Sequence, residues 1–167
     1  MIIGIVLAVS AFLVAVDQLL KVWALQTLAG GPSILVIPGL LQFTYVENRG
    51  AAFGIFQGRV GLLSLFTLAV IVVALILLIR GRLRHPLLMW SVGLIIAGGV
   101  GNLIDRIRTG VVVDYLNCLF INFPVFNFAD VCICVGVGLL VLSLLLDMRR
   151  EQKAKQQKGS APTDGTA

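Results

Sequence analysis

Asp114 and Asp130 are the two residues of this sequence that are best suited to do chemistry together. Both lie beside apolar segments, where an ionisable side chain is costly and therefore marks a functional position. The stretch between them is largely apolar but contains polar residues and a proline, so we expect a hairpin that brings the two carboxyl groups together. Neighbouring carboxyl groups share one proton, so one can act as general base on water while the other acts as general acid. This is the chemistry of an aspartic protease.

The spacing alone also leaves a structural interpretation open. An aspartate at a helix end is commonly a cap or the partner of a basic side chain. Asp105 beside Arg106 fits this interpretation, and so does Asp17 with Lys21, because residues four apart meet on one helix face. Other polar residues fall near the same predicted membrane face as the two aspartates, namely Asn48, Asn102, Arg106 and Asn127.

The composition shows which solvent must hold these residues in place. Apolar residues make up 59% of the chain and charged residues only 13%, where a soluble domain has about a quarter. The mean hydropathy is +1.03. We therefore expect an all-α membrane protein whose helices cross the bilayer.

Four apolar segments are long enough to be spans, and they begin near residues 2, 60, 87 and 131. They end near residues 25, 79, 104 and 146, and the last is expected to begin a few residues before 131. Residues 34–37 and 41–46, on either side of Pro38-Gly39, indicate a small hairpin sheet at the membrane surface. We expect one transmembrane domain over residues 1–150, with outer segments 26–58 and 105–130, and a basic, disordered tail over residues 151–167.

Basic residues predict the orientation of these spans. Eight of them lie in the loop around residues 80–86 and in the tail, and positive charge marks the cytoplasmic side of a membrane protein. Both termini are then cytoplasmic, and Asp114 and Asp130 lie at the outer leaflet. This placement accounts for the net charge of +5 and excludes a nucleic-acid partner.

No metal site or disulfide framework is expected. The three cysteines, Cys118, Cys132 and Cys134, have no pairing pattern, and the only histidine, His85, lies near the opposite membrane face. We interpret Cys132 and Cys134 as small apolar residues of a helix.

Two other classes of protein remain possible on these residues alone. Intramembrane acids are typical of proton-coupled transporters, but here the polar residues gather at one face and form no path across. A structural or assembly protein with buried ion pairs would give Asp114 and Asp130 each a cationic partner.

Five blocks of the sequence resemble, in order, those of the lipoprotein signal peptidases, also called signal peptidase II. Residues 17–21 (DQLLK) resemble D-Q-x-x-K, and residues 48–54 (NRGAAFG) resemble N-x-G-A-[AS]-[FW]. Residues 98–106 (GGVGNLIDR) resemble G-G-x-x-G-N-x-x-D-R, residues 112–115 (VVDY) resemble V-V-D-[FY], and residues 126–130 (FNFAD) resemble F-N-x-A-D. Any one block is weak, whereas five in the family's order are specific.

This resemblance implies a role for each matching residue. Asp114 and Asp130 are expected to be the catalytic pair, and Asp17 with Lys21 a structural polar pair below the site. The resemblance also implies four helices, a small extracytoplasmic β-sheet cradle and a short surface helix near residues 50–56. The expected substrate-binding or site-supporting residues are Asn48, Gly50, Asn102, Arg106, Asn127 and Ala129.

It further implies a monomeric peptidase of the bacterial inner membrane that needs no cofactor. Its partners would be membrane lipid and prolipoproteins that carry a diacylglyceryl group, cut just before the lipidated cysteine. Aromatic residues of the outer segments, Phe43, Tyr45, Phe53 and Phe56, are expected to cover the site.

The sequence departs from the family pattern at three places. Val131 stands where serine is frequent, Phe123 stands where many members have tryptophan before the hairpin proline, and the step from Asp114 to Asp130 is short. None of these departures removes a catalytic group.

Overall fold

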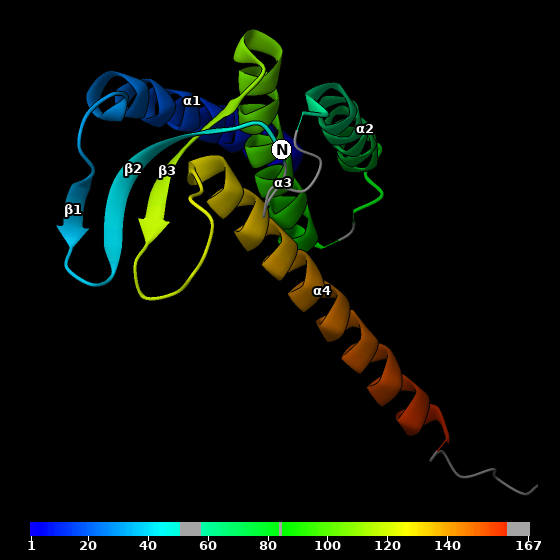
Figure 1. Cartoon of the computed structure of the whole chain (residues 1–167). Helices are drawn as coiled ribbons and strands as arrows, with labels where there is room; N and C mark the ends of the chain where they lie inside the picture. Colours follow the sequence, from blue (N-terminus) through cyan, green and yellow to red (C-terminus); the bar gives the residue numbers. More distant parts are fainter. Residues whose placement is uncertain (51–57, 84, 160–167) are drawn as a thin grey trace, which may run out of the picture.

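The structure is a computed structural model, and it describes residues 1–50, 58–83 and 85–159. Four helices, α1 (Ile2–Leu28), α2 (Val60–Ile79), α3 (Pro86–Thr109) and α4 (Phe128–Gly159), form a bundle, and a small sheet lies beside the end of α1 and the start of α4 (Figure 1). Each helix is long and apolar enough to cross a membrane. The predicted four-helix fold is therefore confirmed, whereas the short surface helix predicted near residues 50–56 falls largely outside the described residues.

Helix α3 is the central helix of the bundle. Of its most apolar stretch 56% is buried, against 11–17% in the other three helices, and it contacts all of them. Its glycines allow this close contact, since a Cβ at Gly98 would collide with the backbone of Ala129 in α4. A Cβ at Gly101 would collide with the Asp17 carboxylate of α1.

These contacts also fix the directions of the helices. Ser10 of α1 donates to the Gly93 carbonyl, and Gln18 of the same helix donates to the Gly101 carbonyl, so α1 and α3 run in the same direction. Helix α4 runs antiparallel to α3, because Gly98 meets Ala129 in the first turn of α4, whereas Gly136, further along α4, meets Ser91 and Ile95, which come earlier in α3. The ends of α1 and α3 and the start of α4 therefore meet at one end of the bundle.

That end carries a three-stranded antiparallel sheet of order β1-β2-β3. Strands β1 (Ile34–Ile37) and β2 (Leu41–Asn48) form the predicted hairpin. Strand β3 (Val112–Cys118) was not predicted, and it pairs with β2 so that Val46 faces Asp114 and Asn48 faces Val112. The polar residues at the end of β2 are thereby brought beside Asp114.

Two helix bounds differ from the sequence analysis. Helix α3 continues to Thr109 and ends at Gly110, whose positive φ of 75° turns the chain into β3. Helix α4 continues to Gly159, because the polar segment after Asp147 is rich in glutamine, lysine and glutamate, which are good helix formers. The predicted tail is thus helical as far as Gly159 rather than disordered throughout.

Candidate active site

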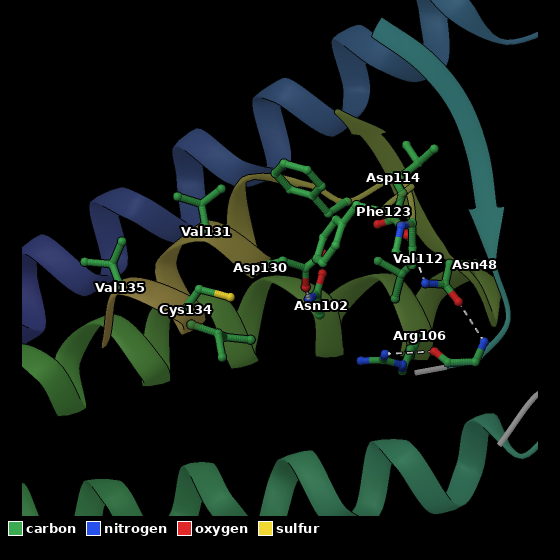
Figure 2. Close-up of a pocket in the computed structure, with 15 residues that line it drawn as sticks. Asn48, Asn102, Arg106, Val112, Asp114, Phe123, Asp130, Val131, Cys134 and Val135 are labelled. Atoms are coloured by element: carbon green, nitrogen blue, oxygen red, sulfur yellow. Dashed lines mark hydrogen bonds between the residues drawn. The ribbon is translucent and has the colours of Figure 1, made fainter. Parts of the chain in front are cut away.

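Asp114 and Asp130 line one cavity of about 450 Å³ between β3 and the facing turns of α3 and α4 (Figure 2). Asp114 comes from β3, and its side chain is buried. Asp130 comes from the first turn of α4. The structure therefore brings together the two carboxyl groups that the sequence singled out.

Asn127 connects the two carboxylates. Its Nδ2 donates to Asp114 Oδ1 over 2.6 Å, and its backbone N–H donates to Asp130 Oδ2 over 3.2 Å. The backbone N–H of Asp130 donates in return to Asn127 Oδ1 over 3.0 Å. This reciprocal pair is a capping box, in which the residue before a helix and its third residue satisfy each other's N–H groups. The fold of the helix start thus holds Asp130 in place.

Two further asparagines donate to the same carboxylates. Asn48, at the end of β2, donates from Nδ2 to Asp114 Oδ2 over 2.9 Å. Asn102, on α3, donates from Nδ2 to Asp130 Oδ1 over 2.7 Å. Each aspartate therefore accepts two N–H donors, and all four contacts involve an asparagine.

The electrostatic setting of Asp114 suits it to hold a proton. Burial raises the pKa of Asp114 from its ordinary value of 3.8 to about 6, and the negative charge of Asp130 acts in the same direction. The donors from Asn48 and Asn127 oppose that rise. A carboxyl group in this state can serve as a general acid near neutral pH.

Arg106 and Gly50 lie at the edge of the cavity, near the end of β2. Arg106 Nη2 donates to the Gly50 carbonyl over 3.4 Å, and its guanidinium interacts electrostatically with both Asp114 and Asp130. Ala129, the remaining predicted site residue, is fully buried against α3 and does not face the cavity. Its backbone N–H donates to Asp17 Oδ1 over 3.0 Å.

A buried ion cluster lies beside the cavity. Lys21 Nζ lies 2.9 Å from Asp17 Oδ2 and 3.0 Å from Asp105 Oδ2. Asp105 thus pairs with Lys21 across the α1–α3 contact, and not with its neighbour Arg106 as the sequence suggests. Gln18 completes the cluster by donating to Asp105 Oδ1 over 3.0 Å.

Of the aromatic residues expected to cover the site, Phe43 and Tyr45 are not among those that line the cavity. Phe123 and Phe126, from the segment between β3 and α4, line it together with Val131 and Cys134. Phe43 instead packs against Trp23, with ring centroids 5.1 Å apart, and against Tyr115. Phe53 and Phe56 lie outside the described residues. Phe123 and Phe126 could have been noticed in the sequence, because they flank the proline of the predicted hairpin.

The side chains around the cavity limit the chemistry that this site can perform. Within the described part of the chain, no group of three or more histidine, cysteine or acidic residues could hold a metal ion. Two carboxyl groups with oriented amide donors and an apolar cavity can activate a water molecule between them.

Comparisons with known proteins agree with this geometry. The family model for signal peptidase (SPase) II matches residues 9–146. The lipoprotein signal peptidase of Symbiobacterium thermophilum is 46% identical over 151 residues, which cover 88% of this chain and 97% of that protein. The lipoprotein signal peptidase of Enterococcus faecalis is 40% identical over 152 residues, which cover 90% and 91%.

Two solved structures have a similar fold. A bacterial membrane enzyme solved at 2.3 Å superposes with a TM-score of 0.79 at 32% identity, over 87% of this chain and 90% of that one. A second bacterial membrane enzyme structure gives a TM-score of 0.77 at 33% identity, over 85% and 93%.

Proposed function

Because this chain belongs to the lipoprotein signal peptidase family and is an aspartic peptidase of the membrane, we propose that Asp114 and Asp130 are its catalytic pair. The observation that carries the proposal is that both carboxyl groups line one cavity and are joined through Asn127. The substrate is a prolipoprotein with a diacylglyceryl group on its cysteine, and the bond cut is the one just before that cysteine.

In this mechanism Asp130 is the general base and Asp114 the general acid. The start of α4 provides a positive helix dipole that favours a carboxylate at Asp130. Burial raises the pKa of Asp114 to about 6, so the shared proton resides there. Asp130 takes a proton from water, the resulting hydroxide attacks the carbonyl carbon, and Asp114 gives its proton to the carbonyl oxygen. Asp130 then gives the proton that it took from water to the leaving nitrogen, Asp114 takes back a proton from a hydroxyl of the tetrahedral intermediate, and the C–N bond breaks.

The residues around the pair would hold the substrate and its developing charge. The Arg106 guanidinium is close enough to both aspartates to stabilise negative charge on the attacked oxygen. Gly50 presents no side chain, so a substrate backbone can approach it closely. The apolar lining from Phe123 and Val131 suits a signal peptide that arrives from the lipid and keeps bulk water out.

The position of the site within the cell belongs to the same proposal. Arg80 and Arg82, after α2, and Arg149 and Arg150, in the later turns of α4, lie at the opposite end of the bundle from the cavity. This favours cytoplasmic termini and a site at the outer leaflet of the inner membrane. A substrate whose lipid and apolar helix are already in the membrane would hold its cleavage site at that depth.

The test is cleavage of a diacylglyceryl lipobox peptide by purified protein in detergent. We expect Asp114→Asn and Asp130→Asn each to lower kcat by about 10³-fold or more, because each removes one half of the acid–base pair. Asp147→Asn is the matched control, since it makes the same chemical change at a half-buried residue of α4 far from the cavity and should keep wild-type activity. Mass spectrometry of the products should place the cut just before the cysteine.

The contrary result is equally clear. If either catalytic variant, folded as judged by its Tm and elution volume, cleaves at a rate like that of Asp147→Asn, the aspartates are not the catalytic pair.

A further inference from the structure

The three asparagines that donate to the aspartates share one arrangement. An asparagine side chain has a donor end and an acceptor end, so a donor held against its oxygen determines which way the amide group points. The Gly50 backbone N–H donates to Asn48 Oδ1 over 2.9 Å, and the Asp130 backbone N–H donates to Asn127 Oδ1 over 3.0 Å. In both cases the fixed oxygen leaves Nδ2 pointing at an aspartate.

Asn102 is fixed by a side chain in the same way. Lys21 Nζ donates to Asn102 Oδ1 over 2.9 Å, and Asn102 Nδ2 then donates to Asp130 Oδ1 over 2.7 Å. Asn127 Nδ2 also donates to Asn102 Oδ1, over 3.1 Å. The reversed amide would set its NH₂ group against an ammonium group and a second NH₂ group, both of which can only donate here.

The contacts of Lys21 are matched to this task. An ammonium group has three N–H donors and no acceptor, and Lys21 has three acceptors within 3.0 Å, on Asp17, Asp105 and Asn102. The side chain is almost fully buried, with 4% of it exposed, so its charge requires a carboxylate partner, and Asp17 and Asp105 both provide one. The two ion pairs hold the ammonium in place, and the third N–H reaches the site.

We propose that Lys21 is a positioning residue of the catalytic pair, which acts through Asn102 to hold an N–H donor on Asp130. This goes beyond a structural ion pair with Asp17, and it rests on the proposed function of Asp130. Its consequence is that loss of the Lys21 donor leaves the Asn102 oxygen held by Asn127 alone. The Asn102 amide, and with it the N–H contact that holds Asp130 Oδ1, is then less firmly fixed.

The test separates the donor of Lys21 from its charge. Removing Lys21 alone would leave Asp17 and Asp105 unpaired, so Asp105→Asn serves as the parent variant, in which the Lys21–Asn102 contact is kept. Lys21→Met and Lys21→Gln are then added to it. Both remove the positive charge, but only Lys21→Gln keeps an N–H donor for the Asn102 oxygen. Asn102→Ala is combined with the parent and with Lys21→Met to complete a double-mutant cycle.

The kcat of Asp105→Asn is the reference, because its own loss of an ion pair is then common to every variant compared. We expect adding Lys21→Met to lower kcat per folded molecule below that reference by about 10- to 100-fold, as misplacement of a reacting group does. The loss in log kcat should be smaller for Lys21→Gln than for Lys21→Met by at least about a third, because glutamine keeps an N–H donor for the Asn102 oxygen. In the Asn102→Ala background, Lys21→Met should change kcat by less than about threefold, since the residue through which Lys21 acts is gone.

Three results would overturn the proposal: equal kcat for the Met and Gln variants, equal losses from Lys21→Met with and without Asn102, or failure of both Lys21 variants to fold. The last would show that Lys21 is a structural residue. None of these results depends on the test of the proposed function, because Asp114→Asn and Asp130→Asn are assayed with Lys21 intact.

Discussion

Ionisation of the buried Asp114 carboxyl group costs free energy, so this residue should make the stability of the folded protein depend on pH. Its side chain is 1% exposed, and burial raises its pKa from 3.8 to about 6. A carboxyl group whose pKa is raised in the folded state binds its proton more tightly there than in the unfolded chain. Its contribution to stability is therefore complete below pH 3.8 and is lost as the pH rises through about 6.

We expect this loss to appear when the wild type is compared with Asp114→Asn, which cannot ionise at this position. As the pH rises from 4 to 7, the wild type should lose stability relative to the variant, by at most about 3 kcal/mol for a shift of this size. Thermal unfolding in detergent at a series of pH values measures the difference. If the wild type loses no stability relative to Asp114→Asn between pH 4 and pH 7, burial does not hold Asp114 protonated.

The sequence predicts much of the site at this scale, but not how its residues are connected. Asp114, Asp130 and the surrounding asparagines are visible because polar residues are rare beside apolar spans. The contact of Lys21 with Asn102 is not visible, because it depends on how α1 is rotated against α3. The pairing of Asp105 with Lys21 rather than with Arg106 has the same cause.

Among the elements, the contact between α3 and α4 determines where Asp130 lies. Gly98 of α3 lies against Ala129, the residue just before Asp130, and against Ile133 one turn further on. Glycine is needed here because any side chain would push the first turn of α4 away.

Gly98→Ala should therefore lower both stability and activity. Overpacking of this kind costs about 1–3 kcal/mol, and displacement of Asp130 should lower kcat as well. Gly138→Ala, on α4, is the control, since a Cβ there meets nothing within 4 Å. It should leave Tm unchanged or slightly raised, because alanine is the better helix former. Equal Tm and kcat for the two variants would mean that α3 and α4 do not hold each other this closely.

The elements were predictable where periodicity or apolar length is strong. The four spans and the β1–β2 hairpin follow from apolar runs and from Pro38-Gly39. Strand β3 does not, because its residues are not cleanly alternating and its partner β2 is far away in the sequence. The extension of α4 was missed because polarity was interpreted as disorder, although the same residues are good helix formers.

At the scale of the whole molecule, the candidate site and the buried polar residues around it lie at one end of an apolar bundle. The sheet lies where α1 ends and α4 begins (Figure 1). The residues that line the cavity and those of the buried ion cluster belong to the same end of the bundle. The loop between α2 and α3 and the basic end of α4 lie at the other end, where His85 Nε2 is 2.7 Å from Arg150 Nη1. The two ends should therefore face opposite sides of the membrane.

Cysteine labelling in intact cells can test that orientation. In a variant with Cys118, Cys132 and Cys134 replaced, Ser33→Cys should react with a maleimide that cannot cross the inner membrane, because exposed Ser33 lies beside the sheet. Gln152→Cys, which is also exposed, should react only after the cells are lysed. If Gln152→Cys is labelled in intact cells and Ser33→Cys only after lysis, the orientation is the opposite one, with the cavity on the cytoplasmic side.

The capping box at the start of α4 has a practical consequence for capturing the enzyme with an uncut substrate. Asp130 accepts the Asn127 backbone N–H and so caps the first turn of α4, and neutralising it weakens this helix start together with the chemistry. Asp114 sits on a strand and has no such second duty, and its neutral form is the one that burial already favours. An inactive variant for crystallising the enzyme with a bound prolipoprotein is therefore better made by substituting Asp114 than by substituting Asp130.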